Sequence, residues 1–309
     1  MSDHLARINI AICSCQRPFL LEKALSSLAA MRRPANSEVL VSIIDNDPEQ
    51  SALPVYEDWR AKFPVALHYA AEPRRGIPVA RNRAIAEAHQ HNADYLVFID
   101  DDEWVEPEWL CELVGYAQQL GGKAVVHGAV VPELPAAAPA YMAEIFFEKG
   151  RPTGTELGSC ATNNVLIPIY LTRELGLRFD ESRPLAGGTD TLFFCAVAEK
   201  GVKIVECAEA KVHEGIPMSR LTSRWLAKRK YRAGITLAWR KREAGRSAVS
   251  LLLSSLVQLI VYSIVALLSR MLMRNVSYYK ALMKMCRSAG VLSGLLGART
   301  DSYTNIEGH

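Results

Sequence analysis

The chain has 309 residues and a formal net charge of only +3, and half of its residues are hydrophobic. This size fits one large domain or a domain with an appendage, and the apolar fraction suffices for a sizeable core. Seven scattered cysteines, with Cys13 and Cys15 as the only close pair, match neither a disulfide framework nor a zinc finger, so we expect reduced thiols in a cytosolic setting. The apolar run 8–13 is too short for a secretory signal peptide, and we expect none.

The charge is unevenly distributed along the chain. Between Arg220 and Arg246 there are ten Lys or Arg residues and a single acid, Glu243, which gives +9 in this segment and −6 in the rest of the chain. A mildly acidic body with one basic segment suggests a local anionic partner. Because the segment matches no nucleic-acid-binding module, we expect no nucleic acid partner and favour membrane lipid or a pyrophosphate group.

The first part of the chain alternates strand and helix patterns. Apolar runs predict strands at 8–13, 39–44, 65–69, 95–99 and 123–131. Between them, helices are predicted from Pro18, through 80–86 and from about 109 to 120. This spacing is typical of an α/β fold with a mostly parallel sheet and helices on both of its faces.

Four carboxylates follow the predicted strand 95–99 directly: Asp100, Asp101, Asp102 and Glu103. Burying an unpaired ionised carboxylate costs several kcal/mol or more, so we expect them at the strand end, where open α/β sheets bind their ligands. Carboxylate oxygens are ligands for Mg²⁺ or Mn²⁺, which also bridge phosphate oxygens. One interpretation is therefore a metal–diphosphate site. The alternative is an acidic turn that precedes the helix beginning near Pro107.

Other acids stand at comparable positions. The predicted strand 39–44 ends on Asp45, which makes a shared site at the sheet edge more plausible. Beyond a Pro- and Ala-rich break at 132–139, the chain continues with strands at 163–167 and 202–205 and a helix at 191–200. Asp190 precedes this helix after a Gly-rich turn, where it is either a simple N-cap or a functional carboxylate. His213 follows the last strand, and a lone histidine there is more often structural than catalytic.

The C-terminal part differs in kind. Residues 247–269 contain no charged side chain, a length sufficient to cross a bilayer core of roughly 30 Å, although several Ser residues and a Gln dilute the apolar run. Three alternatives remain open: a membrane-spanning helix, a helix lying in the membrane interface beside its basic segment, or a buried packing helix. Residues 276–297 add a second amphipathic piece.

These motifs together resemble glycosyltransferase family 2. The resemblance covers about residues 8–215 and rests on the segments CSCQRP at 13–18, IDND at 44–47, Gly76 with ARN at 80–82, FIDDD at 98–102 and GTD at 188–190. The segments VHE at 212–214, WLAKR at 225–229 and SGLLG at 293–297 are similar to the bacterial succinoglycan-type exopolysaccharide glucosyltransferases.

The resemblance implies a GT-A fold and a metal-dependent inverting hexosyltransferase. The expected domains are a GT-A unit at 1–218, with a nucleotide-binding half at 1–131 and an acceptor half at 132–218, and a membrane-associating helical tail at 219–309. Carried over by position, the nucleotide-sugar contacts are Cys13, Ser14, Cys15, Asp45, Arg81, Asn82, Asp100 and Asp101. Asp102 and His213 are assigned to the metal, Mg²⁺ or Mn²⁺, and Asp190 matches the general base.

Two positions depart from the family pattern. Cys15 stands where the family often has an aromatic residue, and Thr189 stands where it often has Glu. The expected reaction is transfer of glucose from a UDP-sugar to a polyprenyl-diphosphate-linked oligosaccharide, at the cytoplasmic face of the bacterial inner membrane, for exopolysaccharide synthesis. The alternatives are a degenerate GT-A protein that acts as a non-catalytic membrane scaffold and a nucleotidyltransferase. The latter is disfavoured because no Gly-rich phosphate loop follows the first strand.

Overall fold

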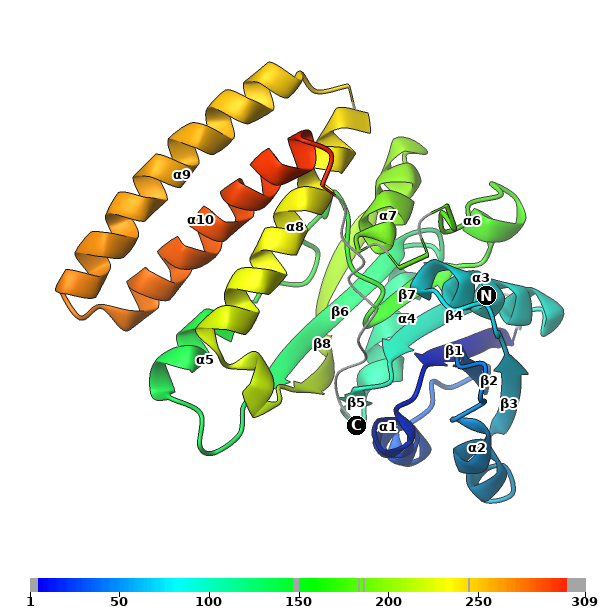
Figure 1. Cartoon of the computed structure of the whole chain (residues 1–309). Coiled ribbons are helices and arrows are strands. Elements are labelled where there is room, and N and C mark those ends of the chain that lie inside the picture. The colour runs from blue at the N-terminus through cyan, green and yellow to red at the C-terminus, as the bar shows by residue number, and fades with distance from the viewer. Residues whose placement is uncertain (1–4, 147–149, 183, 186, 244, 299–309) are drawn as a thin grey trace.

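The structure, a computed structural model, describes residues 5–146, 150–182, 184–185, 187–243 and 245–298. Its centre is an eight-stranded sheet with the strand order β3-β2-β1-β4-β7-β6-β8-β5 (Figure 1). The strands are β1 Ala6–Ser14, β2 Ser37–Asp45, β3 Ala66–Ala71, β4 Tyr95–Asp100, β5 Glu103–Val105, β6 Val125–Glu133, β7 Val165–Pro168 and β8 Ile204–Gly215. The helices are α1 Pro18–Ala30, α2 Leu53–Trp59, α3 Ile77–Gln90, α4 Trp109–Gln119, α5 Ala140–Phe146, α6 Tyr170–Arg173, α7 Thr189–Glu199, α8 Ser223–Glu243, α9 Ala248–Met271 and α10 Asn275–Leu295, and a 3₁₀ turn, η1, covers Met218–Arg220.

The sheet is mostly parallel, as predicted. Strands β3, β2, β1 and β4 are parallel neighbours, and β6 pairs with β8 in the same sense. Strand β7 is antiparallel to both β4 and β6, and β5 is antiparallel to β8. The three-residue strand β5 was not predicted, because it begins at the last of the four acidic residues, Glu103, and is too short to show a period. The predicted α/β fold is confirmed.

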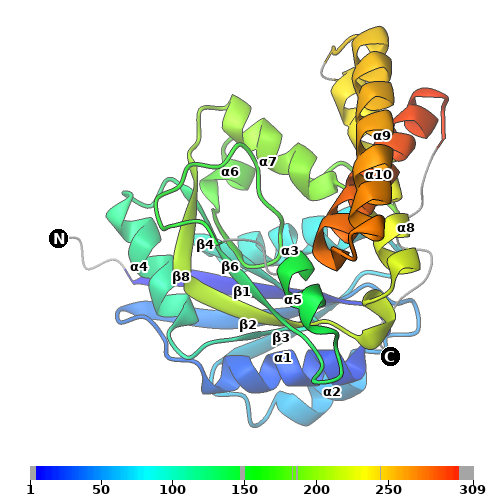
Figure 2. The same cartoon turned by 90° about the vertical axis from the view of Figure 1, so that its left-hand side faces the viewer.

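Helices cover both faces of the sheet (Figure 2). Alternate residues of β1 point to opposite faces, so Ile8, Ile10 and Ile12 pack in one core with α1 and α4. Ala11 packs in the other core, with apolar residues of α3 and α7. Both faces of the central strands are therefore buried, which explains why their sequences are continuous apolar runs.

Strand register determines where the polar residues lie. Ser14 at the end of β1 pairs with Asp45 at the end of β2, and Cys13 pairs with Asp100 at the end of β4. Because these strands are parallel, their carboxyl ends meet at one edge of the sheet.

The three C-terminal helices form a separate layer beside the sheet, with α10 between α8 and α9 (Figure 1). Glycines allow α10 to lie very close to α8: a Cβ atom at Gly290 would overlap the backbone of Tyr231, and one at Gly234 would overlap the backbone of Arg287. Small residues at such contacts are typical of helix pairs in membranes.

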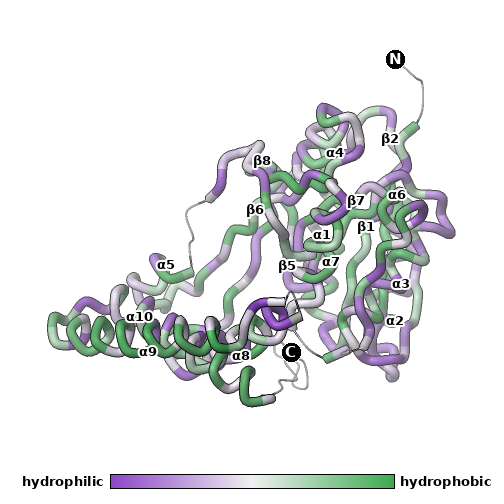
Figure 3. The backbone as a smooth tube through the Cα atoms, turned by 90° about the horizontal axis from the view of Figure 1, so that it is seen from above, coloured by the Kyte–Doolittle hydropathy of each residue, from purple (hydrophilic) through white to green (hydrophobic). Residues whose placement is uncertain are grey.

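Helix α9 is exposed on its apolar side. It is long and apolar enough to cross a membrane, and only 17% of its most apolar stretch is buried. Its buried residues are Leu251, Ser255, Ala266 and Ser269, whereas most of its large apolar side chains are exposed. Figure 3 shows α9 as a mostly hydrophobic helix at the edge of the molecule. A buried packing helix, one of the three alternatives, is therefore wrong. The spanning and the interfacial arrangements both fit this exposure.

Candidate active site

A cavity of about 400 Å³ opens at the carboxyl edge of β1 and β4. Eight of the predicted site residues line it: Cys13, Ser14, Cys15, Arg81, Asp100, Asp101, Asp102 and Asp190. Further lining residues come from the end of β8, from η1 and from α8. The cavity thus brings together residues that are more than two hundred positions apart in the sequence, and it is the candidate active site.

Two of the clustered carboxylates are neutralised by arginines. Asp101 is buried, and it accepts hydrogen bonds from Ser14 Oγ at 2.8 Å and from Arg17 Nη1 at 3.0 Å. Asp102 lies 3.5 Å from Arg17 Nη1 and 3.6 Å from Arg220 Nη2. Burial still raises the pKa of Asp101, to about 6, against the opposing effect of Arg17. These ion pairs explain how adjacent acids are accommodated at the end of a buried strand.

Asp100 is in a different situation. No hydrogen-bond donor or cation contacts its carboxylate within the described residues, although it lines the cavity. Burial, together with the nearby charge of Asp102, raises its pKa to about 7. Its backbone N–H donates to Glu103 Oε2 at 3.1 Å, and Asn163 Nδ2 donates to the other Glu103 oxygen at 3.1 Å. Glu103 therefore stabilises the turn through these two hydrogen bonds. Burial raises the pKa of Glu103 well above its usual value.

The chemistry of this donor set fits a hard divalent cation. Asp100 presents an uncompensated carboxylate to the cavity, and Asp102 lines it beside Asp100. A cation there would relieve the repulsion that raises the pKa of Asp100. No group of three or more His, Cys, Asp or Glu side chains is arranged as a complete metal site in the described parts of the chain. The protein side chains alone would thus supply two ligands, which leaves the remaining positions to phosphate and water oxygens.

The loop 72–76 forms one wall of the cavity beside Cys15. Asn46 fixes this loop, because its Nδ2 donates to the carbonyls of Glu72 and Arg74, both at 2.8 Å, and its Oδ1 accepts from Gly76 N at 2.8 Å. A Cβ atom at Gly76, which has φ 152°, would lie only 2.5 Å from Cβ of Pro184. Only glycine therefore allows this close approach between the loop and the segment before α7.

Asp45 does not line the cavity, contrary to the expected convergence with Asp100, Asp102 and Asp190. It is fully buried, and its carboxylate accepts hydrogen bonds from the N–H of Ala52 at 2.8 Å, the N–H of Asp47 at 3.1 Å and the hydroxyl of Tyr69 at 3.0 Å. These three hydrogen bonds stabilise the turn after β2. Its neighbour Asn46 lines the cavity instead.

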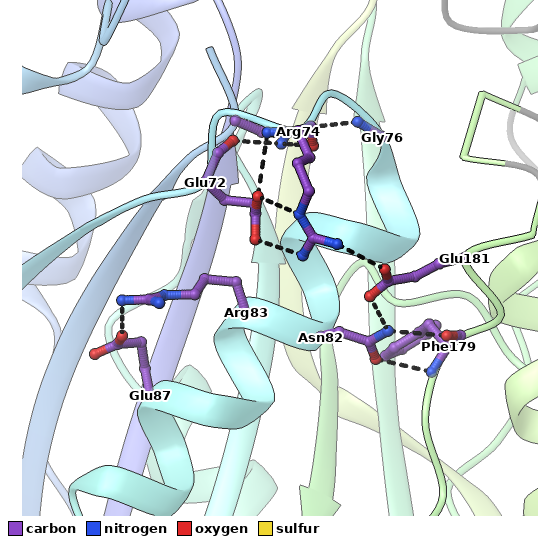
Figure 4. A network of polar contacts seen from close by, with 9 residues as sticks. Glu72, Arg74, Gly76, Asn82, Arg83, Glu87, Phe179 and Glu181 are labelled. Atoms are coloured by element: carbon purple, nitrogen blue, oxygen red, sulfur yellow. Dashed lines mark hydrogen bonds and ion pairs between the residues drawn. The ribbon is translucent and has the colours of Figure 1, made fainter. Parts of the chain in front are cut away.

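Asn82 also lies outside the cavity lining, although the adjacent Arg81 belongs to it. Asn82 donates to the carbonyl of Phe179 at 2.9 Å and accepts from its N–H at 2.9 Å. It donates as well to Glu181, which pairs with Arg74 at 3.2 Å (Figure 4). In this structure Asn82 therefore joins α3 to the segment that leads toward α7.

His213 is likewise absent from the cavity lining. Its ring stacks on Trp104 at 5.7 Å, and its two nitrogens contact Glu133 at 2.8 Å and Glu106 at 3.2 Å. Neighbouring residues of a strand point to opposite faces, so the next residue of β8, Glu214, points to the cavity instead. In this structure Glu214, and not the predicted His213, therefore faces the cavity.

Arginines from the C-terminal region complete the cavity. Arg220 of η1 pairs with Glu214 at 2.9 Å and also with Asp102, and Arg229 of α8 lines the cavity as well. No sequence pattern distinguishes these two arginines, because the basic segment contains ten Lys or Arg residues. The boundary expected between 218 and 219 therefore cuts through the site. The last eleven residues of the expected tail, 299–309, lie outside the described residues.

Asp190 lies in the first turn of α7 and lines the cavity. Gly188 precedes it with φ 90°, and a Cβ atom there would lie 2.8 Å from Thr236 Cγ2 of α8. Helix α8 thus packs directly behind the turn that carries Asp190. Asp190 accepts a hydrogen bond from the adjacent Thr191 N–H at 2.7 Å and faces the cavity, whereas the N-cap position of the helix is Gly188.

Charge in the cavity is balanced between two kinds of group. Five guanidinium groups and five carboxylates line it: Arg17, Arg75, Arg81, Arg220 and Arg229, with Asp100, Asp101, Asp102, Asp190 and Glu214. Guanidinium groups bind phosphate oxygens in a bidentate manner, and the carboxylates provide cation ligands and a proton acceptor. This combination can bind a diphosphate and catalyse displacement at an electrophilic carbon.

Comparison with known proteins agrees with this arrangement. A Glycosyl transferase family 2 profile matches residues 9–162. The chain is 33% identical over 311 residues to the succinoglycan biosynthesis protein ExoM of Rhizobium meliloti (strain 1021), which covers 97% of this chain and 96% of that protein. Two solved structures also share the GT-A-like fold of this chain.

One solved structure is S. aureus TarS 1-349 in complex with UDP-GlcNAc, with a TM-score of 0.53 and 16% identity over 75% of this chain and 65% of that one. Another is GalNAc-T7 with UDP, GalNAc and Mn²⁺, with a TM-score of 0.53 and 13% identity over 70% of this chain and 45% of that one. The end-to-end similarity to ExoM, the family profile and the shared fold lead to one conclusion: the chain belongs to glycosyltransferase family 2 and is a glycosyltransferase.

Proposed function

We propose that this glycosyltransferase transfers glucose from UDP-glucose, with inversion, to a polyprenyl-diphosphate-linked oligosaccharide that is destined for an exopolysaccharide. The single observation that carries the proposal is the common cavity of Asp100, Asp102 and Asp190 with five arginines. Similarity to a succinoglycan biosynthesis protein supports the polymer class, and the fold shared with a UDP-GlcNAc complex supports the donor class.

In the proposed reaction, Asp190 is the general base. Its carboxylate takes the proton of an acceptor hydroxyl as that oxygen attacks the anomeric carbon of the donor. The bond between this carbon and the β-phosphate oxygen breaks, and UDP leaves with the electron pair. Attack from the face opposite the leaving group inverts the configuration.

Arginines would stabilise the negative charge that develops on UDP. Arg81 and Arg229 line the cavity, and within the described residues no carboxylate forms an ion pair with either. Both can therefore donate to diphosphate oxygens without first breaking a salt bridge. Cys13, Ser14 and Cys15 form the part of the lining proposed for the nucleotide base and ribose. Burial raises the pKa of Cys13 to about 12, so this thiol is an uncharged lining group.

A divalent cation, Mg²⁺ or Mn²⁺, belongs to this proposal. Asp100 and Asp102 would hold it, and when bound it would neutralise charge on the diphosphate as a Lewis acid. Support comes from the uncompensated Asp100 carboxylate and from the fold shared with a Mn²⁺-containing structure. Arg17 would keep its ion pair with Asp101, and Arg220 would orient Asp102.

The proposed location is the cytoplasmic face of the bacterial inner membrane. Helix α9 exposes large apolar side chains and lies next to helices rich in Lys and Arg. Each basic residue near an anionic membrane surface contributes about 1 kcal/mol, so several of them would retain the protein there. Helix α8 contributes both to this tail and to the cavity, so in this proposal the cavity lies close to the membrane surface.

The test is UDP release from a panel of UDP-sugars with Mg²⁺ or Mn²⁺ and a lipid-linked acceptor extract. We expect one donor to be used, and Asp190→Asn to lower kcat by about 10²- to 10⁴-fold because the general base is lost. Binding of UDP, measured by calorimetry, should be unchanged in this variant. The matched control is Asp180→Asn, an exposed acid on the segment before α7.

The outcomes separate the proposal from its rival. Full activity in Asp190→Asn would contradict the proposed base. UDP binding without turnover of any donor or acceptor would favour the non-catalytic membrane scaffold, which the Thr189 departure leaves as the second candidate. Formation of the retained anomer, seen by NMR of the product, would contradict inversion.

A further inference from the structure

A second cavity, of about 230 Å³, lies among the three C-terminal helices. Residues of α8, α9 and α10 line it, and none of them lines the active-site cavity. It therefore belongs to the helical layer beside the sheet and not to the catalytic cleft (Figure 1).

The lining is strongly cationic. Lys241 of α8 and Lys284 and Arg287 of α10 face this cavity, and no acid is among its lining residues. None of the three forms an ion pair within the described part of the chain, and all three are exposed. Three like charges around one cavity repel one another, so an anion bound among them would be stabilising.

Polar side chains of the otherwise apolar helix α9 face the same cavity. Ser254, Ser255 and Gln258 line it, and Ser288 Oγ of α10 donates to Gln258 Oε1 at 3.3 Å. The Lys284 ammonium lies 4.9 Å from the centre of the Tyr262 ring, which orients it. Phosphate oxygens accept hydrogen bonds from ammonium, guanidinium, hydroxyl and amide groups alike.

The same stretch of α9 is apolar on its outer side. Leu252, Leu253 and Leu256 are exposed there, beside the residues that line the cavity. A soluble anion would make no use of this surface. An amphiphile would use both features, with its anionic head in the cavity and its hydrocarbon chain along the outer side of α9.

We propose that this cavity binds the diphosphate headgroup of an isoprenoid-type membrane lipid. Three cations match the multiple charge of a diphosphate, with or without an attached glycan, better than the single charge of a phospholipid phosphodiester. Lys241 and Arg229 lie on one helix, twelve residues apart, or about 18 Å along its axis. A lipid bound there could extend its attached glycan toward the cleft. The identification of this lipid as the acceptor rests on the proposed function, whereas its binding does not.

The test measures binding of the full chain to phosphatidylcholine vesicles that contain undecaprenyl diphosphate. Vesicles with phosphatidylglycerol at the same surface charge form a second arm, and inorganic pyrophosphate is the soluble competitor. The cavity variant replaces Lys241, Lys284 and Arg287 with Gln. The control variant replaces Lys228, Arg242 and Lys280 with Gln, which removes the same charge from exposed positions that line neither cavity.

We expect the wild type to prefer the diphosphate vesicles and the cavity variant to lose this binding on the order of a hundred-fold, because each lost cation weakens an anionic lipid contact about five-fold. The control should retain the preference. Equal losses in both variants, or equal wild-type binding to phosphatidylglycerol vesicles, would overturn the proposal. UDP binding by all three proteins reports intact folding. Failure of donor turnover with intact diphosphate binding would contradict the proposed function alone.

Discussion

At the residue scale, neighbours in sequence have opposite environments. Asp101 is buried, accepts a hydrogen bond from Ser14 and pairs with Arg17. Asp102 forms ion pairs with two arginines, and Asp100 lines the cavity without a side-chain partner in the described residues. Of the three carboxylates, only Asp100 therefore lacks a compensating partner in the described residues. The difference follows from where Arg17 and Arg220 lie, because the three residues are chemically identical.

The pKa values of this cluster predict a pH dependence of stability. Those of Asp100 and Asp101 are raised to about 7 and about 6, above the ordinary value of 3.8. The folded protein thus binds these protons more tightly than the unfolded chain does. Their contribution to stability is fully present below about pH 4 and is lost as the pH rises through 6 to 7. Metal-free protein should therefore have a lower Tm at pH 8 than at pH 5.5.

Scanning fluorimetry with EDTA checks this expectation. Asp100→Asn should raise the Tm at pH 8 by several degrees and leave it nearly unchanged at pH 5.5, whereas the exposed Asp180→Asn should have no such effect. Excess Mn²⁺ should raise the wild-type Tm at pH 8 but not that of Asp100→Asn. A lower Tm for Asp100→Asn at pH 8 would show that the charged form is stabilised by contacts other than a cation.

At the scale of the elements, helix α8 connects the active site with the C-terminal layer. It contributes Arg229 to the cavity, packs behind Gly188 through Thr236 and contacts α10 through Gly234. Close packing of α8 and α10 is therefore required for the geometry around Asp190 as well as for the tail.

Alanine substitutions of two helical glycines should have opposite effects. Gly290→Ala places a Cβ atom on the backbone of Tyr231 and should lower stability by about 1–3 kcal/mol, because neither helix backbone can yield locally. Gly115→Ala in α4 meets no atom within 4 Å and should raise stability by about 0.5–1 kcal/mol. Thermal unfolding in detergent measures both, and a stabilised Gly290→Ala would mean that α8 and α10 are farther apart.

At the scale of the whole molecule, the polarity of α9 is inverted relative to a soluble helix. Three of its four buried residues are Ser or Ala, whereas most of its large apolar side chains are exposed. Exposed patches of this kind mark membrane or protein contacts. In the rest of the described chain, apolar side chains gather in three buried clusters.

Charge on this surface should release the protein from membranes. Leu253→Glu with Ile260→Glu, at positions 58% and 61% exposed, should move the protein from the membrane fraction to the soluble fraction. Leu175→Glu, at a 41% exposed position outside the tail, should not. Vesicle flotation of the three proteins measures this shift. Unchanged flotation of the double variant would mean that α9 does not contact lipid.

The sequence alone determined the α/β alternation, the strand ends and the positions of most cavity residues, because hydrophobic periodicity and the acids at strand ends are local properties. Tertiary structure decided which of these residues share a cavity. His213 and Glu214 differ by one position, yet only the pairing of β8 with β5 and β6 shows that Glu214 faces the cleft. Likewise, Asn46 lines the cavity, whereas the carboxylate of Asp45 is bonded within the turn after β2. Arg220 and Arg229 of the basic segment also line the cavity. Such choices depend on register and packing between distant segments, which a local pattern does not contain.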